Sequence, residues 1–216
     1  MPHQSETASR DQLRQLLSER NQYPDRAPAI DAKIHRTFGR TVAILALDMC
    51  GFSRLTEEYG IIHFLAIIHQ MEQAVVPAVT GNGGTILKVE ADNLFATFAE
   101  PAHALEAALD ILRAFEAMNA VLPAERHLRG SIGIGFGEVL IIGGADLFGG
   151  EMNLASKLGE DVAVGMEILL TAAAHEALPP GSYECAPDRC EVGGMDLPYH
   201  RFERCVLTAG PQNDGQ

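Results

Sequence analysis

The sequence has 216 residues, carries a formal net charge of -13 and is 47% hydrophobic. This length and composition suit one globular domain with a sizeable apolar core. An acidic chain without a basic patch is not expected to bind nucleic acid or an anionic membrane. The sequence has no signal peptide at its start and no apolar run long enough to span a bilayer, so we expect a soluble, cytoplasmic protein.

The four cysteines of the chain are Cys50, Cys185, Cys190 and Cys205. Their spacing shows no disulfide framework of the kind that stabilises small secreted domains. Cys185 and Cys190 are too far apart for the paired cysteines of a zinc site, and no second pair accompanies them. We therefore expect neither disulfides nor a structural zinc ion.

The N-terminal segment is expected to form a helical appendage to the main domain. Ser9 is a candidate N-cap, and leucines at helical spacing follow it at positions 13, 16 and 17. The stretch NQYPDRAP then ends the helix, because proline lacks the amide N–H that a helix interior needs. The predicted organisation is an appendage over 1–39, a main domain over 40–208 and a loose tail over 209–216.

The main domain begins with an apolar and β-branched stretch, TVAILAL, which predicts a buried strand. Helical and strand patterns then alternate along the chain. In order, the sequence predicts a strand at 41–47, a helix at 53–79, strands at 85–89 and 94–98, a helix that begins at Pro101, a hairpin around Gly137, a helix at 151–158, a strand at 168–170, a short helix and a last strand that ends near Val206. This order predicts an α+β fold with a ferredoxin-like βαββαβ core and extra C-terminal strands.

The carboxylates Asp48 and Asp92 occupy similar places, because one ends the first strand and the other lies in the turn between the next two. In a βαββ arrangement both would reach one end of the sheet. Two carboxylates held together repel each other unless a cation lies between them, and Mg²⁺ and Mn²⁺ prefer such oxygen ligands. The alternative is a helix cap at Asp48 and an ordinary turn residue at Asp92.

Gly51 closely follows the first aspartate and permits a sharp turn into the next helix. The backbone N–H groups of residues 50–53, which include those of Phe52 and Ser53, could then bind an anion at the helix N-terminus. Carboxylates for a metal ion beside N–H groups for a phosphate indicate nucleotide chemistry.

Four blocks of the sequence, in this order and spacing, resemble the class III nucleotidyl cyclase catalytic domain. They are DMCGFSRLTEEYG, GGTILKVEADNLFATF, SIGIGFGEVLI and DLFGGEMNLASKL, and the resemblance covers residues 40–206. It implies that Asp48 and Asp92 hold two divalent cations, Mg²⁺ or Mn²⁺. It also implies that the carbonyl oxygen of Met49 is a further metal ligand.

The same resemblance implies which residues bind the substrate and act on it. Lys88 and Asp146 correspond to the lysine and the aspartate that read adenine, which favours ATP over GTP as the substrate. Asn153 corresponds to the asparagine that orients the ribose. Lys157 lies one helical turn later, on the same face of the helix.

The reaction that the resemblance implies is attack of the ribose 3′-oxygen on the α-phosphate, which gives cyclic AMP and pyrophosphate. One metal ion would lower the pKa of the 3′-hydroxyl group, and the other would neutralise the triphosphate. In this family the metal ligands and the base-reading residues of one site come from different subunits. A homodimer is therefore implied as the active form.

Three positions depart from the family pattern. Lys157 stands where the family has arginine, and lysine lacks the forked geometry that binds phosphate through two hydrogen bonds. The late lysine that grips the terminal phosphates is missing from the stretch EVGGMDLPYH, although Arg201 or Arg204 could replace it. Ala91 replaces the glycine before the second aspartate, and Glu90 adds a third carboxylate beside it.

These departures leave two alternatives to an active adenylyl cyclase. The chain could be a cyclase-like domain that binds a nucleotide as a regulator and turns it over weakly or not at all. It could instead act on GTP or on a pyrimidine nucleotide. Retention of both aspartates together with Lys88, Asp146 and Asn153 favours the enzyme that acts on ATP.

Overall fold

The computed structural model describes residues 9–51 and 57–206, and the tail predicted at 209–216 lies outside these ranges. The helices of the described residues are α1 (Arg10–Gln22), α2 (Ala27–Phe38), α4 (Ile61–Gly81), α5 (Pro101–Asn119), α6 (Gly150–Lys157) and α7 (Ala172–Glu176), with short helical turns η1 (Pro24–Arg26), η2 (Ala124–Arg126) and η3 (Leu158–Val162). The strands are β1 (Gly39–Met49), β2 (Thr85–Glu90), β3 (Asn93–Phe98), β4 (Gly130–Ile142), β5 (Asp146–Phe148), β6 (Ile168–Thr171), β7 (Tyr183–Val192) and β8 (Met195–Cys205).

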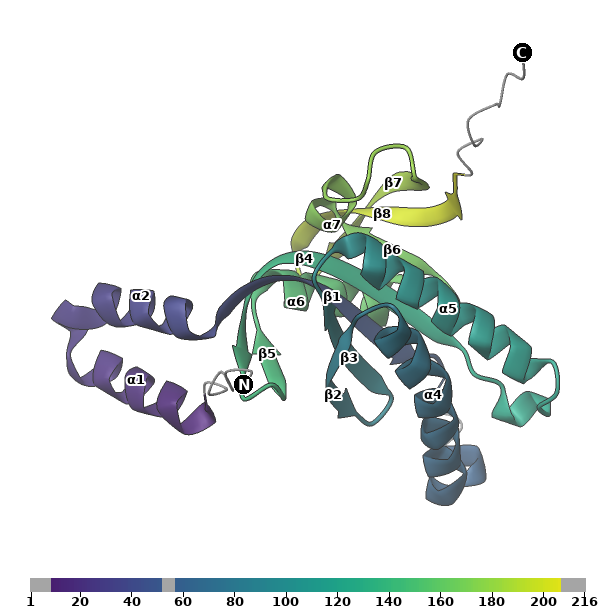
Figure 1. The fold of residues 1–216 in the computed structure, drawn as a ribbon. Helices are drawn as coiled ribbons and strands as arrows, with labels where there is room; N and C mark the ends of the chain where they lie inside the picture. The colour runs from purple at the N-terminus through teal and green to yellow at the C-terminus, as the bar shows by residue number, and fades with distance from the viewer. Residues whose placement is uncertain (1–8, 52–56, 207–216) are drawn as a thin grey trace, which may run out of the picture.

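The described strands form one sheet in the order β2-β3-β1-β4-β6-β8-β7, with β5 paired to β4 (Figure 1). In its central part β1 lies between β3 and β4 and pairs antiparallel with both, which is the strand order of a βαββαβ unit. β6 pairs parallel with β4, and the β7–β8 hairpin extends the sheet beyond β6. The predicted α+β fold with a ferredoxin-like core and extra C-terminal strands is confirmed.

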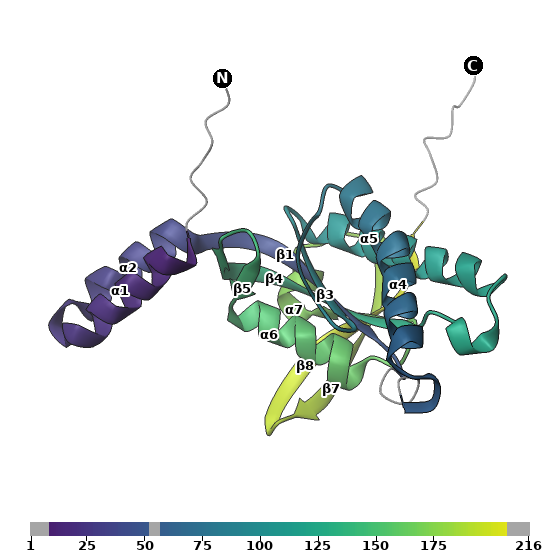
Figure 2. The same cartoon turned by 90° about the horizontal axis from the view of Figure 1, so that it is seen from below.

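Helices α4 and α5 lie on one face of the sheet, and α6 lies on the other face (Figures 1 and 2). The alternation of side chains along β1 explains these layers. Leu45 and Leu47 pack into the cluster under α4 and α5, whereas Ile44 and Ala46 pack into the cluster that includes Ala155 of α6. The same alternation places Asp48 on the α6 face.

Helix α4 is the one helix of the described residues that is long and apolar enough to cross a membrane, with a mean hydropathy of 1.2 in its best window. In the structure it covers the sheet, and Met71, Val75 and Val79 are fully buried there. The later turns of α4 therefore serve the core, as the helical spacing predicted, whereas Ile61, Ile62 and Leu65 at its start are exposed. Residues 53–56 of the helix predicted at 53–79 lie outside the described residues, and the helix is interrupted at Gly60, whose φ is 84°, so that α4 begins at Ile61.

The hairpin predicted around Gly137 is wrong, because residues 130–142 form one uninterrupted strand, β4. The glycines of this strand permit close packing instead of a turn. A β-carbon on Gly133 would lie 1.9 Å from the carbonyl oxygen of Ala155, and one on Gly135 would lie 2.7 Å from that of Glu151. Side chains at these positions would push α6 away from the sheet.

Two strands were not predicted as separate elements, and each has a local reason. β5 has three residues, too few for an alternation of apolar and polar side chains, and Asp146 is the first of them. β7 is polar and contains Pro187, yet it pairs with β8 along almost its whole length. Tertiary pairing, rather than local pattern, makes these segments strands.

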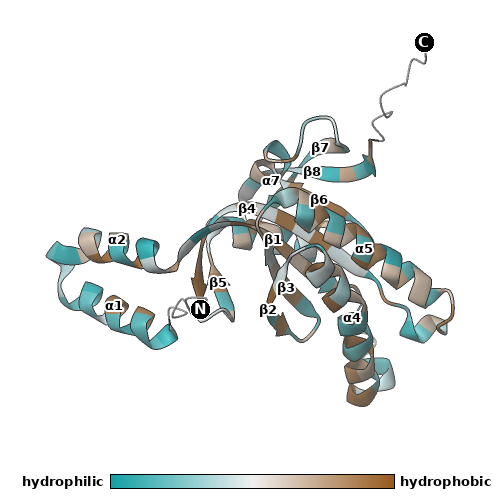
Figure 3. Cartoon of the chain, viewed as in Figure 1, coloured by the Kyte–Doolittle hydropathy of each residue, from teal (hydrophilic) through white to brown (hydrophobic). Residues whose placement is uncertain are grey.

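Helices α1 and α2 form an arm that projects from the sheet, as Figure 2 shows. The predicted helix after Ser9 is confirmed, and the Ser9 hydroxyl accepts a hydrogen bond of 3.2 Å from the Gln12 N–H. Figure 3 shows that α1 is mainly hydrophilic, and Leu16 is its one buried residue. The arm is joined to β4 by a small apolar cluster of Leu16, Ile30, Ile34, Phe38 and Ile142.

We expect Gly133→Ala to destabilise the protein by about 3 kcal/mol or more, because the backbones of α6 and β4 cannot separate without disrupting the sheet. Chemical denaturation followed by circular dichroism measures this loss. Gly81→Ala is the matched control, since a β-carbon there meets nothing within 4 Å. Equal losses in the two variants would contradict the packing explanation.

Candidate active site

The end of β1 is fixed by its neighbours on both sides. Asp48 is paired in register with Asn93 of β3 and Ser131 of β4. The Met49 N–H donates a hydrogen bond of 3.2 Å to the carbonyl oxygen of Asp92 in the β2–β3 turn. The structure therefore brings the Asp48 and Asp92 carboxylates to the same end of the sheet, close enough for the charge of Asp92 to act on Asp48.

The turn after Asp48 only partly matches the expectation. Gly51 has a φ of 80°, in the left-handed region that favours glycine, so a sharp turn does follow the strand. However, the Cys50 N–H donates a hydrogen bond of 2.8 Å to the Arg129 carbonyl oxygen, so it is not available to an anion. Phe52 and Ser53, the other predicted anion-binding residues, lie outside the described residues.

Asp48 lies in a negative environment. Burial and the nearby charges of Asp92, Glu160 and Asp161 raise the pKa of the Asp48 carboxyl group from 3.8 to about 7. Glu160 and Asp161 lie in the π-helical turn η3, directly after α6. No sequence pattern pointed to these two residues, because the end of a surface helix does not reveal which strand it faces. Their presence strengthens the case for a cation, since a divalent ion would relieve this repulsion.

Two carboxylates are the ligands that the sheet offers directly to a metal ion. Within residues 9–51 and 57–206, no group of three or more His, Cys, Asp or Glu side chains is arranged to hold a metal. This donor set fits Mg²⁺ or Mn²⁺, because these ions bind through one or two carboxylates and complete their shell with water and substrate phosphates. The assignment of the Met49 carbonyl oxygen as a further ligand stays a prediction.

The β2–β3 turn forms in spite of the two departures from the family pattern at Glu90 and Ala91. Ala91 has a φ of 52°, in the left-handed region, where a residue other than glycine costs about 1–2 kcal/mol. The turn nevertheless brings Asp92 to the end of β1. Glu90 forms an ion pair of 2.7 Å with Lys88, so its carboxylate is directed toward that lysine and away from the aspartate pair.

Lys88 and Asp146 are far apart in the sequence and meet in the structure. Lys88 lies on β2, Asp146 opens β5, and the ammonium nitrogen is 3.8 Å from the carboxylate. Asp146 is only 9% exposed, and its side chain also accepts a hydrogen bond of 3.0 Å from the Leu147 N–H. Lys88, a hydrogen-bond donor, thus lies beside Asp146, an acceptor. This pair is complementary to the edge of a base on which an amino group lies beside a ring nitrogen.

Asn153 and Lys157 lie one helical turn apart on α6 and line a groove of about 490 Å³. Glu160 and Asp161 line the same groove, so acidic side chains lie near Lys157. Lys157 also lines a second, more apolar cavity of about 370 Å³, which lies between α6 and the β7–β8 hairpin and includes Leu197. The Lys157 side chain therefore stands between the two hollows.

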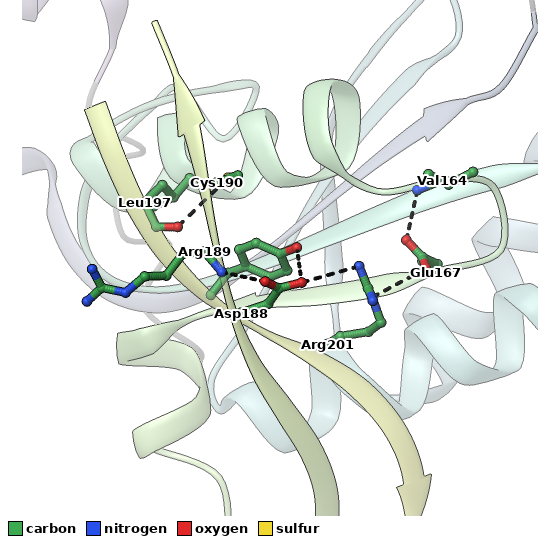
Figure 4. A network of polar contacts seen from close by, with 8 residues as sticks. Val164, Glu167, Asp188, Arg189, Cys190, Leu197 and Arg201 are labelled. Carbon is green, nitrogen blue, oxygen red and sulfur yellow. Dashed lines mark hydrogen bonds and ion pairs between the residues drawn. The ribbon is translucent and has the colours of Figure 1, made fainter. Parts of the chain in front are cut away.

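Neither Arg201 nor Arg204 is free to take the place of the missing late lysine. Arg201 lies between Glu167, at 3.3 Å, and Asp188, at 3.7 Å, as Figure 4 shows. Arg204 forms an ion pair with Glu184. Both guanidinium groups therefore already neutralise carboxylates of the sheet, and the suggestion that either replaces the late lysine is not supported by their surroundings.

Lys157 reaches from α6 to the β7–β8 turn. A β-carbon placed on Gly193 would lie 3.9 Å from the Lys157 Nζ atom. In the part of the chain that the structure describes, Lys157 has no ion-pair partner. Its ammonium group is therefore available to an anion that enters either of the two hollows that Lys157 lines.

No protein family model matches the chain. Over 164 residues it is 26% identical to a Rhizobium meliloti protein named "Putative adenylate cyclase 3", a match that covers 76% of this chain and 26% of that protein. It is also 26% identical to an adenylate/guanylate cyclase/hydrolase from Silicibacter pomeroyi, with a TM-score of 0.64 over 76% of this chain and 95% of that one. The guanylyl cyclase Cya2 has a TM-score of 0.69 at 19% identity, over 81% of this chain and 96% of its own.

These likenesses confirm the fold and the resemblance found in the sequence. The chain spans about a quarter of the length of the Rhizobium protein. Because the similar structures are named as both adenylyl and guanylyl cyclases, the likeness alone does not choose between ATP and GTP. The choice has to come from the side chains that face the base.

We expect the metal-free protein to lose stability as the pH rises from about 4 to about 7. In this range the folded protein keeps a proton on Asp48, whose pKa is about 7, whereas the unfolded chain, with a pKa of 3.8, has lost it. The folded state then binds more protons, so the free energy of unfolding falls as the pH rises. Asp48→Asn removes this effect and should be more stable than the parent at pH 8 by about 1–2 kcal/mol, allowing for solvent screening of a half-buried side chain.

Thermal unfolding in EDTA at pH 4.5 and at pH 8 measures this difference, which should be smaller at the lower pH. Addition of Mn²⁺ at pH 8 should reverse the order of the two proteins, because the ionised aspartate is the form that binds the ion. A stability gap that stays constant with pH would contradict the assigned role of Asp48.

Proposed function

The chain has the fold of the class III nucleotidyl cyclase catalytic domain, and we propose that it converts ATP into 3′,5′-cyclic AMP and pyrophosphate. The observation that carries this proposal is the meeting of Lys88 and Asp146 at 3.8 Å from separate strands. The amino group of adenine would donate to Asp146, and the adjacent ring nitrogen would accept from Lys88. Guanine has a carbonyl oxygen where adenine has its amino group, so this pair favours ATP.

Asp48 and Asp92 would hold two divalent cations, Mg²⁺ or Mn²⁺, with the Met49 carbonyl oxygen as a further ligand. When bound, these ions activate the 3′-hydroxyl group and neutralise the charge of the triphosphate. Asn153 would orient the ribose from α6, and Lys157 would donate hydrogen bonds to the phosphate oxygens as pyrophosphate leaves. No residue of this set is an obvious general base, so positioning and charge would supply most of the acceleration.

The active form would be a homodimer in which each site takes residues from both subunits. Within one protomer, the charges that act on Asp48 and those that act on Lys88 come from two separate groups of residues. Asn153 is exposed on α6, where a second copy could reach it. A second protomer would bring the metal half of one chain to the base half of the other, and the dimer would act in the cytoplasm.

A nucleotide-binding regulator with little or no turnover is the second candidate, and one observation favours it. Arg201 and Arg204 are engaged in ion pairs, which leaves Lys157 to meet the triphosphate near the β7–β8 turn. One lysine neutralises less charge than the arginine and the late lysine of the family pattern together. It also lacks the forked geometry of arginine. Such a protein would bind ATP and a metal ion without fast product formation.

Incubation of the purified chain with Mn²⁺ and each of ATP, GTP, CTP and UTP tests the proposal by product analysis. We expect cyclic AMP from ATP, and none from Asp48→Ala or Asp92→Ala, because each variant lacks a ligand for the metal ions. Unchanged product in either variant would contradict the two-metal assignment, and cyclic GMP as the main product would contradict the preference for ATP. Binding of ATP with no cyclic product would favour the regulator.

The same assay tests whether the site is shared between subunits. Asp48→Ala and Asn153→Ala should each be inactive alone. Their mixture should recover about a quarter of the parent activity, because half of the dimers would be mixed and each mixed dimer would have one intact site of two. Mixed dimers without any activity would place all of these residues in one protomer.

We expect Lys157→Arg to raise the turnover number for ATP about threefold to tenfold, because a guanidinium group binds phosphate oxygens through two hydrogen bonds. Steady-state kinetics with ATP and Mn²⁺ measures this gain. Lys33→Arg on the exposed face of α2 is the matched control and should have no effect. A clear fall in turnover for Lys157→Arg would mean that the groove is adapted to lysine.

A further inference from the structure

The carboxylate of Asp146 already has partners on both of its oxygens. Oδ2 accepts a hydrogen bond of 2.5 Å from Nη2 of Arg10. Oδ1 accepts one of 3.0 Å from the Leu147 N–H and lies 3.8 Å from Lys88 Nζ. A substrate group that needs Asp146 therefore meets a carboxylate that is already bound.

Arg10 is the first residue of α1, and the start of this helix lies beside β5 in both views of the chain (Figures 1 and 2). The Arg10 side chain is 58% exposed and that of Asp146 is 13% exposed, so the arginine reaches from the surface to a largely buried group. Among the described residues, this contact is the one hydrogen bond from α1 to the sheet. It can break without disturbing Leu16, which packs the helix onto the arm cluster.

The guanidinium group competes directly with an amino group of the substrate. Hydrogen bonds between a guanidinium and a carboxylate are charge-assisted and about twice as strong as those of a neutral donor. An exocyclic amino group must therefore displace Arg10 from Oδ2 or share this oxygen with it. A base that presents a carbonyl oxygen at this place meets no such competition, and it can accept a hydrogen bond from the guanidinium group itself.

We propose that Arg10 is a specificity-determining residue of the nucleotide site, because it competes with the adenine amino group for Asp146 and so lowers the preference for ATP over GTP. This inference rests on the proposed function in one respect, namely that Asp146 reads the base. Arg10 and the amino group need the same oxygen, so the Arg10–Asp146 contact weakens ATP binding, and ATP binding weakens this contact by the same factor.

Isothermal titration calorimetry on the full chain tests this without turnover. The probes are the α,β-methylene analogues of ATP and GTP with Mg²⁺, since neither analogue can release pyrophosphate. We expect Arg10→Ala to bind the ATP analogue about threefold to tenfold more tightly than the parent, and the GTP analogue no more tightly. Arg14→Ala is the matched control, because Arg14 lies on the same helix and pairs with Asp11 of that helix at 3.5 Å. It should change neither affinity.

A variant of Asp146 separates competition for its carboxylate from any other effect of Arg10. In Asp146→Asn, the further change Arg10→Ala should leave the affinity for the ATP analogue unaltered, because the shared carboxylate is gone. Equal or weaker binding of the ATP analogue by Arg10→Ala would overturn the inference. Absence of cyclic product from the parent would contradict the proposed function alone, whereas analogue binding that does not depend on Asp146 would overturn both.

Discussion

Repulsion between carboxylates at the end of β1 is the constraint on which the rest of the site depends. Backbone pairing with β3 and β4 fixes Asp48, and a hydrogen bond from Met49 holds the turn of Asp92 against the same strand. Burial of Asp48, together with the charges of Asp92, Glu160 and Asp161, raises the pKa of its carboxyl group to about 7. A divalent cation would relieve the repulsion, which is the physical basis of the proposed metal and nucleotide chemistry at this edge of the sheet.

The position of α6 depends on a different physical limit, the absence of side chains on one face of β4. Gly133 and Gly135 let the backbone of α6 come so close to the sheet that it occupies the space where a β-carbon would lie. This close approach carries Asn153 and Lys157 to the groove and brings the acidic turn η3 toward Asp48. Packing of small residues thus decides the electrostatics of the site.

The proposed role of Arg10 would give the arm control over a site that the sheet, α6 and η3 build together. Its first helix is mainly hydrophilic and packs through one buried residue, Leu16, and its first residue places a guanidinium on the carboxylate of Asp146. An exposed arginine outside the arm cluster suits a competitor that has to leave when a substrate binds, because no core packing is lost on its release. In this proposal, the Arg10 contact and binding of the base to Asp146 belong to one equilibrium.

The sequence by itself determined most of the helices and strands, the ferredoxin-like core and the approach of Asp48 to Asp92, because these follow from local periodicity and from pairing between strands that are close in the chain. Local pattern misread the glycines around Gly137 as a turn, since a glycine needed for close packing looks the same in a sequence as one needed for a turn. Only the tertiary structure brought η3 near Asp48 and Arg10 to Asp146. Such contacts join segments far apart in the chain, and their geometry depends on how helices dock on the sheet, which no local pattern records.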